Sequence, residues 1–193
     1  VVHYIKESKN KGQSHGFILH NNLFLNATNQ GLFSTDIRFK NSRTSLVKNS
    51  QGVNWHIKKI DNTVFVGHEK GIFIYERDNS LRLLHPVNGV WDFRQHNSRK
   101  DLIYCGTYNG ILILKKNNGK WSFYKRLDGF YDSSRFMEFD SNYLWVCHPA
   151  KGFFKLGLSD DLENIKSFEF LKNFDSNDEL FYNYFFKLND ALI

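Results

Sequence analysis

The sequence is poor in several features that would identify a protein class. It has two Pro, one Met and two Cys in 193 residues, so neither a proline-rich disordered segment nor a disulfide framework is expected. It contains no CxxC pair and no His/Cys cluster at ligand spacing, so we expect no metal site and no cofactor. No apolar run approaches the roughly 20 residues that span a bilayer, so no transmembrane segment is expected.

Aromatic residues are abundant instead. Nineteen Phe, nine Tyr and a 41% hydrophobic fraction favour a packed, sheet-rich core. The formal charge is +6, but the basic residues are dispersed, with no run beyond pairs such as Lys58-Lys59. A solvated surface is therefore favoured over a nucleic-acid stripe, and we expect no direct nucleic-acid contact. The chain begins without Met and in a strand-like segment, so we interpret it as part of a longer protein.

A repeat of about 40 residues runs along the chain. Glycines 31, 71, 110 and 152 each stand between two apolar runs, at spacings of 40, 39 and 42 residues. Such a period without helical patterning is typical of a propeller. We predict an all-β chain of four-stranded antiparallel blades, with about four repeats that form part of a larger ring. The predicted repeats cover 14–49, 53–86, 89–127 and 134–172, with a strand at 2–7 and a partial repeat from 181.

The segment NYLWVCHPAKGFFKL, residues 142–156, places Cys147 next to His148 and so suggests a nucleophile and its base. When the repeats are aligned on their turn glycines, Cys147 falls opposite Cys105 and Val66. His148 falls opposite Gly106. Because catalytic residues are not expected to recur as Val and Gly, we interpret the segment as a structural module.

The repeats resemble a known family over nearly the whole chain, and the second copy fits through Val66, Gly67 and Gly71. Residues 102–111, LIYCGTYNGI, and residues 144–154, LWVCHPAKGFF, resemble the two-component-regulator propeller repeat, whose pattern is roughly L-W-[IV]-G-T-x-x-G-L. The third copy matches through Gly106, Thr107 and Gly110. The fourth has Cys147-His148 in place of Gly-Thr and a turn that is one residue longer.

The resemblance implies a function. Such repeats build the periplasmic sensor region of bacterial hybrid two-component or one-component regulators, which are inner-membrane proteins. It implies an adjacent immunoglobulin-like domain, the rest of the propeller and a homodimer as partners. It also implies a separate output domain that controls transcription. The ligand expected for this non-enzymatic sensor is an oligosaccharide or another small molecule.

Candidate ligand-binding residues lie where each repeat enters its first strand, which is expected to line the mouth of the central channel. Aromatic rings there suit the C–H face of a sugar, and charged or amide groups suit its hydroxyls. The same residues are also consistent with core packing or with a channel that holds only water. The candidates are Trp55, His56, Trp91, Asp92, Arg94, Tyr131 and Arg135.

Two other functions remain open. A polysaccharide lyase or glycosidase propeller needs paired carboxylates about 5–10 Å apart or a His/Tyr/Arg set, and Asp92 with Asp132 is the most obvious pair. A protein-interaction or dimerisation scaffold would instead use an exposed aromatic patch.

Overall fold

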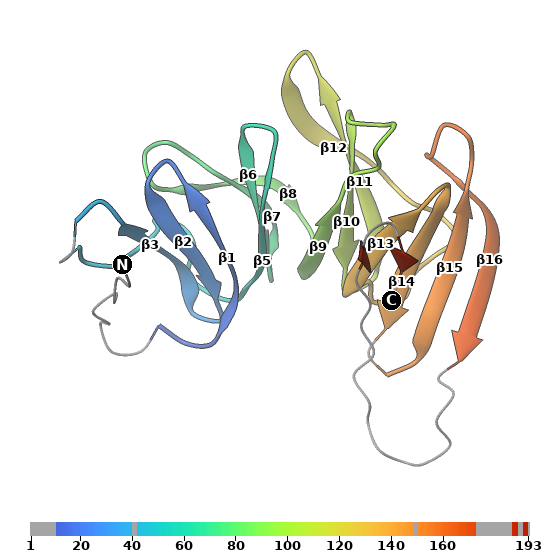
Figure 1. Ribbon diagram of the computed structural model, residues 1–193, viewed down its shortest axis with the longest axis horizontal. Coiled ribbons are helices and arrows are strands. Elements are labelled where there is room, and N and C mark those ends of the chain that lie inside the picture. The colour runs from blue at the N-terminus through green and yellow to red at the C-terminus, as the bar shows by residue number, and fades with distance from the viewer. Residues whose placement is uncertain (1–10, 40–41, 149, 173–186, 189–190, 193) are drawn as a thin grey trace. The chain divides into compact units, whose positions relative to one another are not determined.

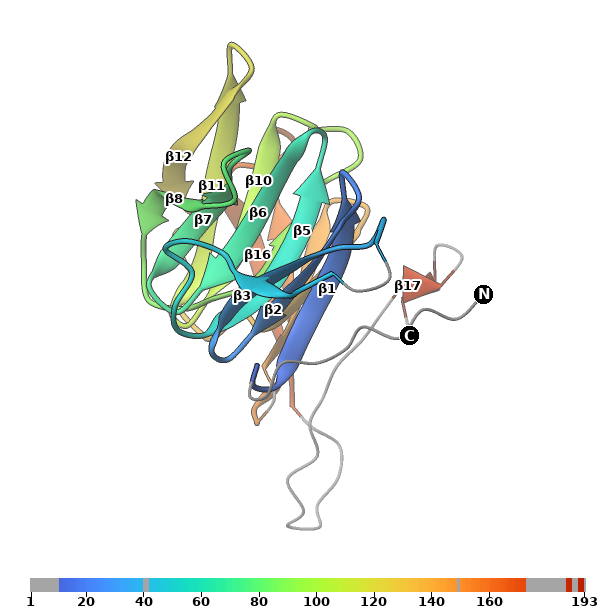
Figure 2. The same ribbon diagram turned by 90° about the vertical axis from the view of Figure 1, so that its left-hand side faces the viewer.

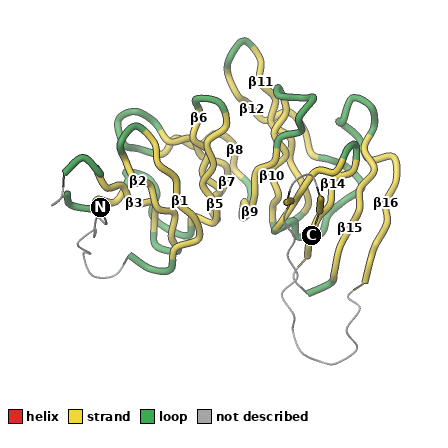
Figure 3. The backbone as a smooth tube through the Cα atoms, viewed as in Figure 1, coloured by secondary structure: helices red, strands yellow, loops and turns green. Residues whose placement is uncertain are grey.

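The computed structural model describes residues 11–39, 42–148, 150–172, 187–188 and 191–192. These residues form strands, turns and loops, and no helix is present among them (Figure 3). The chain divides into two compact units, residues 1–90 and 91–193.

Unit 1 contains two antiparallel sheets of four strands, each in sequential order (Figures 1 and 2). The first sheet consists of β1 (Ser14–His20), β2 (Leu23–Thr28), β3 (Gly31–Asp36) and β4 (Ser45–Leu46). The second consists of β5 (Asn54–Ile60), β6 (Thr63–His68), β7 (Gly71–Tyr75) and β8 (Leu81–Pro86).

Two further sheets of the same kind follow. The third sheet consists of β9 (Val90–Arg94), β10 (Leu102–Thr107), β11 (Gly110–Asn117) and β12 (Lys120–Arg126). The fourth consists of β13 (Phe136–Asp140), β14 (Tyr143–His148), β15 (Gly152–Leu158) and β16 (Ile165–Lys172). A short pair, β17 (Lys187–Leu188) and β18 (Ala191–Leu192), comes last. The strand predicted at 2–7 and most of the partial repeat predicted from 181 lie outside the described residues.

The predicted architecture of four-stranded antiparallel blades is confirmed in these four sheets. Each blade depends locally on the hairpin that joins the second and third strands of its repeat. Gly110, for example, has φ of 87°, a conformation that costs glycine nothing and strains other residues. Thr107 closes this turn, because its Oγ1 donates to the Gly110 carbonyl at 2.8 Å and accepts from Asn109 N at 3.2 Å.

The turn of the fourth sheet is closed in a similar way by His148. Its Nδ1 accepts hydrogen bonds from Ala150 N at 3.2 Å and from Lys151 N at 3.1 Å. His148 pairs with Gly152, as Thr107 pairs with Gly110. The histidine of the predicted structural module therefore works as a turn cap.

The strand register corrects the predicted alignment of Cys147. Cys147 pairs with Phe153, one step before the turn, and the residue at this step in the third sheet is Gly106, which pairs with Ile111. The prediction that Cys147 corresponds to Cys105 is wrong, because the extra residue in the fourth turn shifts the second strand by one position. A one-residue shift also moves a side chain to the other face of the sheet.

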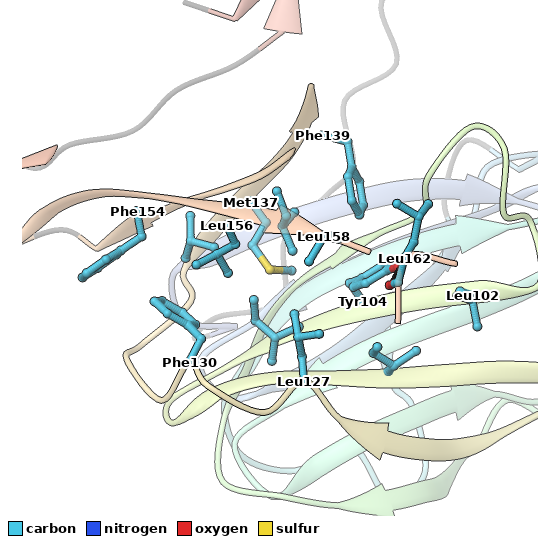
Figure 4. Packing of buried hydrophobic residues seen from close by; sticks show 14 residues of the cluster. Leu102, Tyr104, Leu127, Phe130, Met137, Phe139, Phe154, Leu156, Leu158 and Leu162 are labelled. Carbon is cyan, nitrogen blue, oxygen red and sulfur yellow. Dashed lines mark hydrogen bonds between the residues drawn. The ribbon is translucent and has the colours of Figure 1, made fainter. Parts of the chain in front are cut away.

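A hydrophobic core joins the two sheets of each unit. In unit 1 it includes Leu25, Leu32, Ile57 and Val66. In unit 2 Phe130 packs edge-to-face on Phe154, with ring centroids 5.1 Å apart (Figure 4). Aromatic pairs in this geometry stabilise the fold by more than the burial of their surface area alone.

Glycine at the penultimate position of the second strand lets neighbouring backbone come close. A Cβ built on Gly106 would lie 2.1 Å from the Ser134 carbonyl oxygen, and one on Gly67 would lie 2.4 Å from the Val90 carbonyl oxygen. Ser134 and Val90 are therefore corresponding positions, each just before the first strand of its sheet or at its start. Consequently the next residues, Arg135 and Trp91, also correspond.

Candidate ligand-binding site

A planar side chain occupies the corresponding position at the start of the first strand in all four sheets. We call these four residues the planar positions: His15, Trp55, Trp91 and Arg135. His15 and Trp55 are bulged residues, since the register of β1 shifts between Ser14 and Gly16 and that of β5 between Asn54 and His56. A β-bulge changes the direction of its side chain and is over-represented next to functional sites.

In unit 1 the two planar positions stack on each other. The rings of His15 and Trp55 have centroids 4.8 Å apart and planes inclined by 16°. His15 Nδ1 donates a hydrogen bond to the Asn54 carbonyl oxygen at 3.0 Å, which holds the imidazole in this orientation. Both side chains are half-buried, so part of the stack faces solvent.

In unit 2 the two planar positions also stack. The Arg135 guanidinium carbon lies 4.9 Å from the centroid of a Trp91 ring and 5.5 Å from that of Phe136. Tyr108, in the turn after β10, lies beside Trp91 with centroids 5.0 Å apart. Cation–π stacking of this kind contributes about 0.5–1 kcal/mol where the pair is exposed. The result is a half-buried cluster of three aromatic side chains and one cation.

Asp92 and Arg94 form a different kind of arrangement. Asp92 is 2% exposed, and its carboxylate accepts hydrogen bonds from Met137 N at 3.1 Å and from Arg94 Nη1 at 2.8 Å. Arg94 Nε donates to the Met137 carbonyl oxygen at 2.5 Å. These bonds link β9 to β13 and give Asp92 and Arg94 a structural role. Their contact with a ligand stays a prediction.

The remaining predicted residues are placed as follows. His56 is half-buried in β5 and pairs with Gly67 of β6. Tyr131 is 63% exposed in the loop after β12. Asp132, the second half of the predicted carboxylate pair, forms an ion pair with Lys151.

The thiol of Cys147 lies within the protein rather than on its surface. Its exposed fraction is 0%, and burial raises its pKa to about 12 although Arg135 opposes the shift. Since the thiolate is the nucleophilic form, this thiol is inert near neutral pH. In the described part of the chain no group of three His, Cys, Asp or Glu side chains is arranged to hold a metal ion. Nor does that part contain a helix long and apolar enough to cross a bilayer.

Sequence reasoning missed His15 and Tyr108. His15 stands 13 residues before Thr28, as Trp55 stands before His68, so the spacing within the repeat contained the signal. Tyr108 follows Thr107 directly in the turn after β10, and nothing in the sequence indicates that it meets Trp91.

Comparison with solved structures places the fold among propellers. The chain is similar to the extracellular domain of a putative one-component system of B. thetaiotaomicron, with TM-score 0.67 and 14% identity, over 96% of this chain and 26% of that one. A second structure, described as a putative hybrid two-component system of that organism, gives TM-score 0.62 and 15% identity over 86% of this chain and 22% of that one.

Other similar structures come from unrelated contexts. The computationally designed Ika4 protein matches with TM-score 0.57 and 11% identity, over 77% of this chain and 93% of that one. The Neurospora crassa Pan2 WD40 domain matches with TM-score 0.55 and 13% identity, over 82% of this chain and 50% of that one. Searches against family models and against curated proteins give no match.

These likenesses show the fold. At such identities they do not extend to activity, and the chain spans about a quarter of the two extracellular domains. The predicted resemblance to the sensors of two-component regulators is supported at the level of the propeller fold.

Proposed function

We propose that this chain belongs to a non-enzymatic sensor propeller of a bacterial signal-transduction regulator and that it binds an oligosaccharide. In this proposal the propeller lies in the periplasm, pairs as a homodimer, and adjoins an immunoglobulin-like domain. A separate output domain then controls transcription. The likeness to extracellular domains of such systems supports the setting.

One observation carries the ligand class, namely that the planar positions stack in pairs within each unit. His15 with Trp55, and Trp91 with Arg135, present stacked flat groups at corresponding points of successive repeats. Flat, partly exposed rings suit the C–H faces of sugar units. A catalytic role is less well supported, because Asp92 is bonded to Arg94 and Met137, and Asp132 to Lys151.

The test is a thermal-shift and calorimetric screen of the full chain against an oligosaccharide panel. A ligand at about 100 times its dissociation constant adds roughly 2.7 kcal/mol of stability. We expect Trp55→Ala and Trp91→Ala to weaken binding, while Phe123→Ala, which removes an exposed aromatic ring from the outer strand β12, has no effect. Release of a product from any panel member would contradict the non-enzymatic part of the proposal.

A protein-contact role is the second candidate, and an exposed apolar face of β1 favours it. Phe17 and Leu19 are 64% and 63% exposed, and Phe17 packs on Phe24 at a centroid distance of 5.3 Å. Ile57 and Val64, which correspond in the second sheet to Phe17 and Phe24, are buried in the unit 1 core. This face is therefore suited to contact with a further blade of the same kind, in the same chain or in a second chain.

The double variant Phe17→Ser/Leu19→Ser tests this role. If the face is an interface between copies, light scattering should show a smaller assembly with unchanged sugar binding. An unchanged mass would remove the support for contact between copies.

A further inference from the structure

Arg135 differs from the other half-buried arginines of unit 2 in its bonding. Arg94 is bonded to Asp92 at 2.8 Å, and Arg99 to Asp101 at 2.9 Å and to Glu163 at 3.2 Å. For Arg135, by contrast, the described residues supply ring contacts alone, from Trp91 and Phe136, and neither a hydrogen bond nor an ion pair.

Ring stacking occupies the flat faces of a guanidinium group and leaves the N–H donors at its edge able to bind an anion. The five N–H donors of arginine lie in the plane of the group, in a fork that matches the two oxygens of a carboxylate. The rings of Trp91 and Phe136 hold the Arg135 group in place, so little side-chain entropy is lost when an anion binds. A held fork of this kind favours two parallel charge-assisted hydrogen bonds.

The charges around Arg135 do not cancel its own. Asp132, three residues before it, is paired with Lys151. The thiol of Cys147, which interacts electrostatically with Arg135, has a pKa raised to about 12 and is neutral near pH 7. Glu138, three residues after it, is paired with Arg94. The cluster of Trp91, Tyr108 and Arg135 thus combines aromatic surface with one net positive charge.

We propose that Arg135, held on Trp91, binds the carboxylate of a uronic acid unit, so that the preferred ligand is an acidic oligosaccharide. This inference rests on the proposed sugar-binding function and narrows it. Arg135 forms the bidentate contact, and the rings of Trp91 and Tyr108 adjoin the apolar face of the same sugar unit.

The test compares matched ligands by calorimetry on the full chain at low and physiological salt. Tetragalacturonate is the acidic probe, galactotetraose is its neutral counterpart, and a sulfated galactotetraose carries the other common sugar anion. We expect tetragalacturonate to bind at least about tenfold more tightly than galactotetraose, as hydrogen bonds to a charged group imply. Tighter binding of the sulfated probe would overturn the assignment to a carboxylate.

Variants of Arg135 test whether this residue causes the preference for tetragalacturonate. Arg135→Gln should weaken tetragalacturonate binding by about 10- to 100-fold and leave galactotetraose binding nearly unchanged, while Arg135→Lys should recover only part of the loss. Arg77→Gln, which removes the same charge from an exposed turn in unit 1, is the matched control. An equal loss in both variants would show a long-range charge effect and overturn the inference.

The two proposals fail in different ways. If galactotetraose binds as tightly as tetragalacturonate, the sugar-binding function is supported and the proposed carboxylate contact of Arg135 is contradicted. If none of the three probes binds and a wider neutral panel is also negative, the sugar-binding function itself falls. Melting temperatures show whether the variants fold. We expect small changes, because Arg135 makes only ring contacts with the described residues.

Discussion

Each unit joins its two sheets through a hydrophobic core, and the two units differ in the polar bonds that supplement this core. In unit 1 the seam between the sheets is apolar and supplemented by main-chain bonds. Lys48 N donates to the Asn79 carbonyl oxygen at 3.1 Å, and Leu81 N donates to the Lys48 carbonyl oxygen at 2.8 Å. The backbone thus forms a short parallel bridge between Lys48 and Ser80.

In unit 2 charged and polar side chains cross the seam. Glu163 accepts from Lys115 Nζ at 3.0 Å, from Arg99 at 3.2 Å and from Tyr124 Oη at 2.7 Å. Tyr104 Oη donates to the Leu162 carbonyl oxygen at 2.5 Å, close to the packed side chains in Figure 4. The difference teaches that one repeat pattern permits two chemistries at its seams, because the hairpins define the blades and the side chains between them are free to vary.

The largest expected effect is from removal of the carboxylate inside the unit 2 seam. Asp92→Ala leaves Met137 N without its acceptor and removes the buried carboxylate that pairs with Arg94, and loss of one partner of a buried charged pair costs about 3–5 kcal/mol. Urea denaturation measures this loss, and hydrogen exchange should locate it in β9 and β13. Asp132→Ala, which breaks an exposed pair with Lys151, should cost less than about 1 kcal/mol. Equal costs would contradict the structural role of Asp92.

Two glycine positions differ in how closely the neighbouring backbone approaches them. Gly106→Ala places a methyl group 2.1 Å from the Ser134 carbonyl oxygen, so we expect a loss of about 1–3 kcal/mol from overpacking in unit 2. Gly16→Ala meets only Ile57 Cγ2 at 3.9 Å and should be within about 0.5 kcal/mol of the parent. Thermal melts of both variants decide the point, and a tolerated Gly106→Ala would show that the two sheets can move apart.

Acid should weaken the unit 2 seam through Glu163. Its pKa is lowered by the hydrogen bond from Tyr124 and by those from Lys115 and Arg99. The stability that it contributes is present above its unfolded pKa of about 4.3 and is lost as the pH falls through the lower folded pKa. Glu163→Gln should cost about 1 kcal/mol at neutral pH. The cost should fade below about pH 4, as measured by urea titration.

The smallest expected effect lies in unit 1 at mildly acidic pH. Burial lowers the pKa of His68, whose Nδ1 accepts from Lys70 N and whose Nε2 donates to the Gln51 carbonyl oxygen. Below about pH 6.5 the unfolded chain takes up a proton that the folded chain resists, so stability falls until the folded pKa is passed. Between pH 7 and 5.5 the melting temperature should drop by less than about 2 °C.

His68→Thr is the matched control, because Thr28 and Thr107 cap the corresponding turns in two other sheets. This variant should keep the fold and lose that part of the pH dependence. An unchanged pH profile would assign the effect to another group of unit 1, such as His20 or His85, whose pKa values are also lowered by burial.

Much of the fold follows from local sequence, because hairpins form between neighbouring segments. The recurring glycines with φ above zero, such as Gly71 and Gly110, and the apolar runs beside them predict each sheet without knowledge of the others. The repeat spacing also leads to Trp55, Trp91 and Arg135 as corresponding positions. A one-residue insertion in the fourth turn was enough to misplace Cys147, since register depends on the pairing that forms.

Contacts between sheets join residues some 40 positions apart, and no local pattern specifies them. That Arg135 stacks on Trp91 and that Asp92 bonds to Met137 depends on how two separately formed hairpin sets pack. Packing selects among many compatible side-chain pairs by shape and by the need to satisfy buried polar groups. The sequence thus determined the blades and their order, whereas tertiary packing decided which side chains hold the blades together and which stay partly exposed.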